Sequence, residues 1–221
     1  MKPAPVIAID GPSASGKGTV AQRVARELGF HYLNSGALYR LVALAVIRKG
    51  IDTSDEAAAA AVALQLPVPR FEGDEIFFED RPVGELIAAE QCSAVASLVA
   101  ALPKVRQALL ERQRAFRRQP GLVAEGRDMA SIVFPDAGLK VFLTASLEAR
   151  ADRRHKQLKE KGIAATLARL LQDLRERDAR DASRSVAPLK QSPGARLLDT
   201  TSLSAAQAAA LIVGWYRGAN G

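Results

Sequence analysis

The sequence contains few of the residues that build metal centres and disulfide frameworks. Among 221 residues there are one cysteine and two histidines, and aromatic residues make up 5%. The lone cysteine, Cys92, excludes an intrachain disulfide and favours a reducing compartment. His31 and His155 lie far apart in the sequence, so no Cys/His cluster predicts a zinc site.

Long apolar runs are also missing. The first apolar run, residues 6–9, stops at Asp10 and is too short for a signal peptide. The longest uncharged stretch, residues 200–216, opens with Thr-Thr-Ser-Leu-Ser, which is typical of a capped helix and not of a membrane span. We therefore expect a soluble, cytoplasmic protein that has no membrane partner.

The chain is rich in arginine. Lys and Arg total 31 against 24 Asp and Glu, for a net charge of +7, and 22 of those cations are Arg. The planar guanidinium group binds a phosphate or carboxylate through two parallel hydrogen bonds, which a lysine ammonium does not do. The charge balance therefore points to anionic partners, either nucleotides or nucleic acid.

Short apolar segments alternate with helical patterns along the whole chain. The segments are residues 6–9, 122–124, 141–143 and 197–198. Such alternation predicts an α/β fold, with a central parallel sheet of about five strands flanked by helices, in one domain over residues 1–221. In residues 68–84, short β-like pieces are separated by turn residues, which predicts a small antiparallel insertion.

A segment rich in glycine and serine follows the first predicted strand and opens the first predicted helix. Glycine lets successive backbone N–H groups turn toward a phosphate, the helix N-terminus adds its dipole, and a lysine supplies a compact charge. This setting predicts a P-loop that binds ATP, whereas a plain glycine-rich turn is the alternative. The expected ATP ligands are Gly11, Pro12, Ser13, Ala14, Ser15, Gly16, Lys17, Gly18 and Thr19.

One position departs from the usual P-loop pattern, in which Ser or Thr directly follows the lysine. Here Gly18 intervenes and Thr19 carries the hydroxyl, so coordination of Mg²⁺ by the loop is left open. We expect Mg²⁺ to bind through the ATP phosphates and water, with Thr19 or Glu125 as the candidate protein groups. No direct metal ligand is assigned.

Four blocks of sequence resemble the bacterial cytidylate kinases, which are nucleoside monophosphate kinases with a P-loop. The blocks run from residue 7 to about residue 200 in the family's order. They are residues 9–19, Asn34-Ser-Gly-Ala-Leu-Tyr-Arg40, Glu125-Gly-Arg-Asp-Met129 with Val133-Phe-Pro-Asp136, and Glu176-Arg-Asp-Ala-Arg-Asp181 with Arg184 and Val186-Ala-Pro188. The resemblance implies a P-loop kinase that transfers the γ-phosphate of ATP to CMP or dCMP. Asn34, Glu125 and Ala130 depart from the family's usual Asp, Asp and Gly.

The resemblance also implies an acceptor site for CMP and dCMP. Its ligands would be Ser35, Arg40, Ser97, Arg106, Arg127, Asp128, Arg177, Asp181 and Arg184. Within this set, Arg40, Arg127 and Arg184 would hold the phosphate. Ser97, Arg106 and Asp128 would recognise the base, and Arg177 and Asp181 the ribose.

Several of these side chains also have a plainer interpretation from the sequence alone. Ser35 is the expected N-cap of a helix, Ser97 an ordinary helix serine, and Arg106 a solvated charge. Arg177 and Asp181 are spaced as an i,i+4 salt bridge on one helix face. Arg40 can equally belong to a surface salt bridge.

Three arginines on one face of a predicted helix indicate a mobile lid. Arg150, Arg153 and Arg154 stand at i, i+3 and i+4, and the resemblance implies a lid at about residues 150–162 that excludes water when closed. A solvated basic face is the alternative. The acceptor-binding region is expected at about residues 34–118, with the insertion at about 60–98. The implied catalytic residues are Lys17, Arg127, Arg153, Arg154 and Arg184.

Two rival functions stay open on sequence alone. One is the same reaction on another acceptor, such as UMP or AMP. The other is nucleic-acid binding regulated by a nucleotide, which the net charge of +7 and the basic residues 104–118 motivate. We expect a monomer that binds ATP and CMP or dCMP and no nucleic acid.

Overall fold

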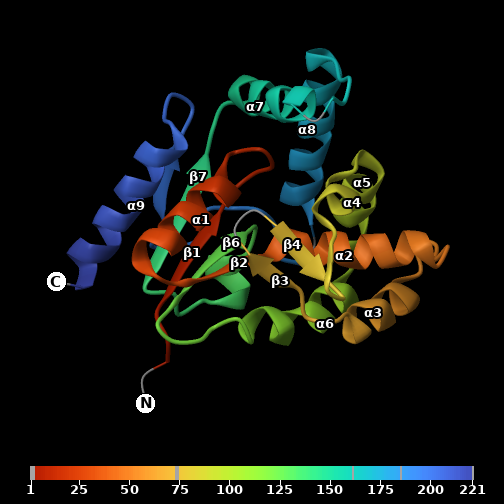
Figure 1. The fold of residues 1–221 in the computed structure, drawn as a ribbon, viewed down its shortest axis with the longest axis horizontal. Helices are drawn as coiled ribbons and strands as arrows, with labels where there is room; N and C mark the ends of the chain where they lie inside the picture. The colour runs from red at the N-terminus through yellow and green to blue at the C-terminus, as the bar shows by residue number, and fades with distance from the viewer. Residues whose placement is uncertain (1–2, 73–74, 161, 185, 221) are drawn as a thin grey trace.

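The computed structural model describes residues 3–72, 75–160, 162–184 and 186–220, and Figure 1 shows how the elements are arranged. In chain order the elements are β1 (Val6–Asp10), α1 (Lys17–Leu28), β2 (His31–Asn34), α2 (Ser35–Arg48), α3 (Glu56–Gln65), β3 (Arg70–Glu72), β4 (Glu75–Phe78), β5 (Arg81–Pro82), α4 (Gly84–Ala88), α5 (Glu90–Val99), α6 (Pro103–Arg114), β6 (Leu122–Gly126), the π-helix η1 (Met129–Val133), β7 (Leu139–Thr144), α7 (Leu147–Glu160), α8 (Leu167–Ser183), β8 (Arg196–Asp199) and α9 (Ala205–Asn220).

The main sheet has five strands in the order β2-β6-β1-β7-β8, and every neighbouring pair is parallel. The predicted α/β fold with about five parallel strands is therefore confirmed. β2 is a strand that the sequence did not predict, because only Leu33 of its four residues is fully buried and no apolar run marks it. It pairs with β6 and forms one edge of the sheet.

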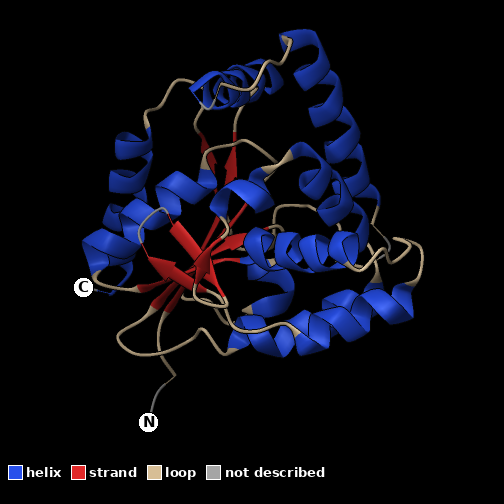
Figure 2. Cartoon of the chain, turned by 45° about the vertical axis from the view of Figure 1, so that its right-hand side comes forward, coloured by secondary structure: helices blue, strands red, loops and turns tan. Residues whose placement is uncertain are grey.

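Helices cover both faces of this sheet (Figure 2). Alternation along β1 divides its side chains between two cores: Val6 and Ala8 face one core, and Ile7 and Ile9 face the other. The first core includes residues of α2, α3, α5 and α6, and the second includes residues of α1 and α9. Because all five strands are parallel, their carboxyl ends lie at one edge, where ligands of open α/β sheets bind.

The predicted antiparallel insertion is also present. Strands β3, β4 and β5 form a three-stranded antiparallel sheet in that order. Phe71 anchors this sheet through ring contacts with Tyr32, at 5.8 Å between centroids, and with Phe116, at 5.7 Å. Residues 73–74 of the insertion and residue 161 of the expected lid lie outside the described residues.

The start of α2 differs from the prediction by one residue. Asn34, and not Ser35, is the N-cap, because its Oδ1 accepts the N–H of Ala37 at 3.0 Å. The amide oxygen of asparagine caps a helix as effectively as a carboxylate does, so the departure from the family's Asp leaves this bond intact. Ser35 becomes the first helical residue and is buried.

None of the described helices is long and apolar enough by itself to cross a membrane. Helices α5 and α6 reach the required length and composition only as a pair, and the pair is bent by 99°.

Two adjacent positions on α9 test the packing of the second core. Ile212 is fully buried, whereas Leu211 is 43% exposed. We expect Ile212→Ala to lower the free energy of unfolding by about 2–5 kcal/mol, because it leaves a cavity between α9 and the sheet. Leu211→Ala should change it by no more than about 0.5 kcal/mol. Urea denaturation followed by circular dichroism measures both, and equal losses would contradict the described packing.

Candidate active site

Glycine shapes the loop after β1 at two positions. A Cβ at Gly11 would lie 2.0 Å from the carbonyl oxygen of Leu143 on β7, so a larger residue does not fit. Gly16 has a φ of +90°, which glycine adopts without strain, and it is the N-cap of α1. The loop therefore brings the N-terminus of α1 to the carboxyl edge of the sheet, the arrangement that binds phosphate in proteins.

Lys17 folds back over this loop. Its Nζ donates to the carbonyl oxygen of Pro12 at 3.1 Å and lies 3.8 Å from Oε2 of Glu125. Burial and the positive charge of Arg127 lower the pKa of Lys17 to about 7, although Glu125 opposes the shift. An anion in the loop would favour the charged ammonium, so the surroundings of Lys17 suit a phosphate ligand.

Glu125 is the carboxylate beside this lysine. It is buried at the end of β6, and its Oε1 accepts from the hydroxyl of Tyr32 at 3.4 Å. Gly18 lies against that oxygen, since a Cβ there would be 3.5 Å away, whereas Thr19 is exposed. Among the described residues, no three His, Cys, Asp or Glu side chains gather into a metal site. One carboxylate beside a phosphate loop fits a divalent cation that is held mainly by nucleotide phosphates and water.

Asp181 on α8 holds two arginines from separate parts of the chain. Its Oδ2 accepts from Nε of Arg127 at 2.7 Å, and its Oδ1 accepts from Nη2 of Arg184. Burial alone would raise the pKa of Asp181, but the charges of Arg127 and Arg184 outweigh burial and hold it below its usual range. Three residues that the sequence predicted for the acceptor site are thus in direct contact.

Arg177 and Arg40 lie beside this group with little compensating charge. The Nε of Arg177 is buried and has no hydrogen-bond partner among the described residues. Burial and the charges of Arg127 and Arg40 lower the pKa of Arg177. Burial and the charge of Arg154 likewise lower the pKa of Arg40, whose Nη1 donates to the carbonyl oxygen of Ile87 at 2.6 Å. These guanidinium groups repel one another, and a bound anion would relieve that repulsion.

The result is a cluster of cations around two carboxylates, which we call the arginine cluster. Its cations are Lys17, Arg40, Arg127, Arg154, Arg177 and Arg184, and its carboxylates are Glu125 and Asp181. Five arginines and Lys17 stand against these two carboxylates, so positive groups outnumber negative ones. An excess of this kind suits a ligand, or two adjacent ligands, with several phosphates.

A buried ion pair adjoins the arginine cluster. Nη2 of Arg106 on α6 donates to Oδ2 of Asp128, which follows β6, and both side chains are buried. Nη1 of Arg106 donates to the carbonyl oxygen of Ala100 at 3.1 Å, and its guanidinium lies 5.7 Å from the centre of the Tyr39 ring. The pair presents both a donor and an acceptor beside an aromatic ring, a pattern that can read the edge of a nucleobase.

Ser97 on α5 is buried, and it has a partner that the sequence did not predict. Nε of Arg180 on α8 donates to its Oγ at 3.3 Å. Arg180 thereby connects α8 with α5. Its position in the matched block was visible in the sequence, but its spacing does not distinguish it from the solvated arginines of the same helix.

Arg150 and Arg153 of α7 donate to backbone carbonyl oxygens of the phosphate loop. Nη1 of Arg153 donates to the carbonyl oxygen of Ser15 at 3.0 Å, and Nη1 of Arg150 donates to that of Ser13 at 3.2 Å. Arg150 also pairs with Asp178 on α8 at 2.6 Å. Because these bonds hold the loop carbonyls outward, they favour the conformation in which its N–H groups face a phosphate. Asp178 and this contact of Arg150 were not predicted, since both depend on the packing of α7 against α8.

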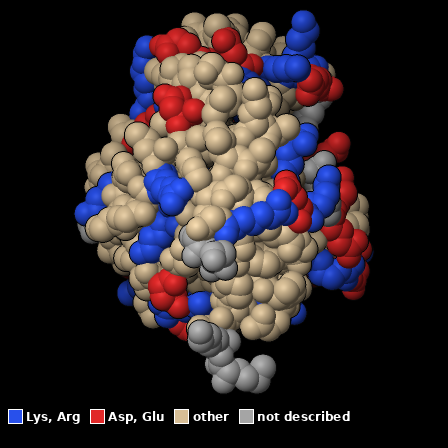
Figure 3. Space-filling model, turned by 90° about the vertical axis from the view of Figure 1, so that its left-hand side faces the viewer, with Lys and Arg blue, Asp and Glu red and all other residues tan. Residues whose placement is uncertain are grey.

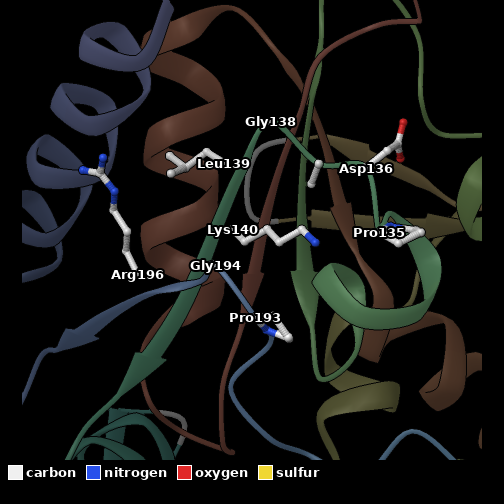
Figure 4. Close-up of a pocket in the computed structure, with 9 residues that line it drawn as sticks. Pro135, Asp136, Gly138, Leu139, Lys140, Pro193, Gly194 and Arg196 are labelled. Carbon is white, nitrogen blue, oxygen red and sulfur yellow. The ribbon is translucent and has the colours of Figure 1, made fainter.

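A cavity of about 460 Å³ lies at the other end of the sheet (Figure 4). Leu139, Lys140 and Arg196 are among the residues that line it. Leu139 pairs with Ile7 near the start of β1, whereas the phosphate loop follows Asp10 at its end. The cavity is therefore separate from the candidate site.

Comparison with known proteins assigns the family. A sequence profile of the cytidylate kinases matches residues 7–217. The chain belongs to the cytidylate kinase family. Cytidylate kinase of Bordetella bronchiseptica is 58% identical over 214 residues, which cover 97% of this chain and 96% of that protein. Cytidylate kinase of Polynucleobacter asymbioticus is 55% identical over 219 residues, which cover 99% of each chain.

Among solved structures, an uncharacterized protein from Eubacterium ventriosum aligns with a TM-score of 0.50 at 13% identity, over 97% of this chain and 98% of that one. At this identity the likeness concerns the fold alone. Membership of the cytidylate kinase family confirms the resemblance noted in the sequence, and it implies nucleotide substrates and a divalent metal ion.

The ion pairs of Asp181 give a test of the arginine cluster. We expect Asp181→Asn to lower the free energy of unfolding by about 3–5 kcal/mol, because Arg127 and Arg184 lose their buried counter-charge. Asp173→Asn on the same helix removes only an exposed pair at 4.0 Å and should cost less than about 0.5 kcal/mol.

Denaturant titration at pH 7 measures both values for Asp181→Asn and Asp173→Asn. In the unmodified protein the contribution of Asp181 is present above its ordinary pKa of 3.8 and is lost as the pH falls through the lower value of the folded state. Similar losses for the two variants would show that Asp181 does not hold the cluster together.

Proposed function

We propose that this protein transfers the γ-phosphate of ATP to CMP or dCMP, which gives CDP or dCDP and ADP. One observation carries the proposal: the arginine cluster has a neighbour on each side. Lys17 connects it to the phosphate loop, and Arg127 connects it to the buried Arg106–Asp128 pair. Donor phosphates, an acceptor phosphate and a base therefore each find suitable groups in one continuous site. The family and the 55–58% identity to cytidylate kinases support the same reaction.

The donor phosphates occupy the loop of residues 11–19. The loop N–H groups and Lys17 bind the β- and γ-phosphates. The ammonium group of Lys17 then leaves the neutral carbonyl oxygen of Pro12 and donates a charge-assisted hydrogen bond to a phosphate. A bound Mg²⁺ would supply positive charge that neutralises the charge developing on the phosphates. Glu125 is buried beside Lys17 and would orient water around the cation, whereas the side chain of Thr19 is exposed.

The acceptor phosphate lies among Arg40, Arg127 and Arg184. A nucleoside monophosphate is largely ionised at neutral pH, since its second pKa is about 6, so transfer needs no general base. Catalysis then consists of holding two phosphates in line and neutralising charge that spreads over the transferred group. Asp181 accepts from a sugar hydroxyl, and Arg177 donates with its unpartnered Nε.

Ser97, Arg106 and Asp128 discriminate between cytosine and uracil. Cytosine carries an exocyclic amine that donates to a carboxylate, and its ring nitrogen and carbonyl accept from a guanidinium. Uracil replaces the amine by a carbonyl and protonates the ring nitrogen, so it would leave buried polar groups unpaired. The buried Arg106–Asp128 pair is matched to the cytosine pattern.

Three structural roles complete the proposal. The region of about residues 34–118, with the insertion at about 60–98, contains side chains that bind the acceptor, and about residues 150–162 close as a lid. Arg153, which donates to the carbonyl oxygen of Ser15, and Arg154, whose charge acts on Arg40, belong to that lid. Closure excludes water, which would otherwise compete as the acceptor.

The protein works as a cytoplasmic monomer without a nucleic-acid partner. Its one cysteine, Cys92, is buried and free, as suits a reducing compartment. On the face shown in Figure 3, basic and acidic side chains are scattered among uncharged ones.

The substrate assignment is tested by release of ADP from ATP and Mg²⁺ with CMP, dCMP, UMP or AMP. We expect CMP and dCMP to be used far faster than the others. Lys17→Ala should lower kcat/KM by about 10²–10³-fold, the effect of losing one preorganised charge at the transferred group. Lys140→Ala, at the opposite end of the sheet, is the matched control and should leave the rate unchanged.

Each other outcome rejects part of this proposal. Equal use of UMP would keep phosphoryl transfer and reject the cytosine contacts. Absence of turnover with every acceptor, together with salt-sensitive binding of RNA or DNA, would reject the kinase assignment.

Asp128→Asn tests base recognition directly. The amide has the same shape but presents a donor where the cytosine amine also donates, so we expect the ratio of kcat/KM for CMP to that for UMP to fall at least about tenfold. Lys104→Ala, an exposed position on the helix that carries Arg106, is the control. An unchanged ratio would remove Asp128 from the base pocket.

A further inference from the structure

Asp10 is a buried carboxylate to which the reaction proposed above gives no task. It is the last residue of β1, directly before the phosphate loop, and it is 2% exposed. Its Oδ1 accepts the N–H of Met129 at 2.8 Å, and its Oδ2 accepts the N–H of Ala130 at 2.8 Å. One carboxylate thus binds two successive backbone groups that lie far away in the sequence.

Those two N–H groups open the π-helix η1. The first N–H groups of a helix have no partner within the helix, and the N-cap side chain commonly binds one of them. Here the N-cap is Asp128, but its side chain makes no capping bond and is instead paired with Arg106. Asp10 performs the capping from β1, so the carboxylate of Asp128 is not needed as a cap and pairs with Arg106.

The same bonds fix the segment that carries the acceptor contacts. Arg127 and Asp128 stand between Gly126, the last residue of β6, and Met129, the first residue of η1. Gly126 is held by its pairing with Asp10 in the sheet, and Met129 by the Asp10 carboxylate. The backbone on both sides of Arg127 and Asp128 is therefore attached to a single residue.

We propose that Asp10 is a positioning residue that fixes Arg127 and Asp128, and so couples the geometry of the phosphate loop to selection of the acceptor base. This inference rests on the proposed function, because Asp128 and Arg127 contact CMP only if CMP is the acceptor. Asp10 itself touches neither substrate. It acts through the two backbone N–H groups of η1.

The pKa of Asp10 distinguishes the positioning role from a purely stabilising one. Burial raises the pKa of Asp10 to about 6, and the negative charge of Asp128 adds to this rise. The hydrogen bonds from Ala130 and Met129 and the positive charge of Arg127 oppose the rise. Because this pKa lies above the ordinary value of 3.8, ionisation of Asp10 lowers stability as the pH rises between the two values. At neutral pH the charge at position 10 therefore opposes folding while it holds the acceptor segment in place.

Asp10→Asn is the variant that tests the role. The amide keeps the size of the side chain but turns an NH₂ donor toward one of the two N–H donors, so that bond is lost. We expect KM for CMP to rise, and the preference for CMP over UMP to fall, each by about tenfold or more, since a displacement of about 1 Å in a reacting site can cost about 10²-fold. KM for ATP should change by less than about threefold, since the loop keeps its glycines and Lys17.

Asp55→Asn is the matched control. Asp55 caps α3 through a bond of 2.9 Å from its Oδ1 to the N–H of Ala58, and it takes no part in the proposed site. This substitution makes the same change from carboxylate to amide outside η1, at a cap whose bond to Ala58 an amide oxygen can keep, so it should leave both KM values and the CMP preference unchanged. Equal behaviour of the two variants, or an unchanged CMP preference in Asp10→Asn, would overturn the proposal.

A measurement on the unmodified protein covers the case in which Asp10→Asn does not fold. Amide NMR should show slow exchange at Met129 and Ala130, and their proton shifts should change with a midpoint near pH 6, close to the pKa of Asp10. Fast exchange at both amides would overturn the proposal whatever the variant does. If the unmodified protein fails to phosphorylate CMP, the proposed function is wrong, and the NMR result still decides whether Asp10 holds η1.

Discussion

Buried positive charge at the carboxyl edge of the sheet is the constraint on which the rest of this site depends. Asp181 binds Arg127 and Arg184, whereas Arg40 and Arg177 are less fully compensated. Charges of one sign that are held together in a poorly solvated place repel one another and lower the stability of the empty protein. A site that is electrostatically unfavourable when empty binds phosphates strongly, because the ligand supplies the missing negative charge.

The parallel sheet explains how residues from distant parts of the chain reach that edge. In register, Asp10 of β1 stands beside Gly126 of β6, and both strands end there. The segments that leave the sheet at this edge, the phosphate loop and the Arg127–Asp128 segment, therefore start as neighbours. Side chains on α8 then close the acceptor side, since Asp181 and Arg180 reach Arg127 and Ser97.

Most of the architecture could be predicted because it follows from local patterns. Four of the five parallel strands are continuous apolar runs, and the phosphate loop is identified by its glycines and lysine. β2 escaped prediction because Leu33 is its only aliphatic residue and no apolar run marks it, whereas the equally short edge strand β8 contains Leu197-Leu198. The cap at Asn34 was misplaced by one residue, since Asn34 and Ser35 are both good caps and the backbone conformation decides between them.

Within the candidate site, the sequence by itself determined which residue types are available and in which blocks they lie. It determined the loop with Lys17, the surplus of arginine, and the family to which the blocks are similar. Only the tertiary structure decided which charges meet. Arg127 and Asp181 are 54 residues apart, Asp10 and Met129 are 119 apart, and no spacing rule links such positions. Hydrogen bonds and ion pairs depend on distances of a few ångströms, which for remote residues arise only when strands and helices pack together.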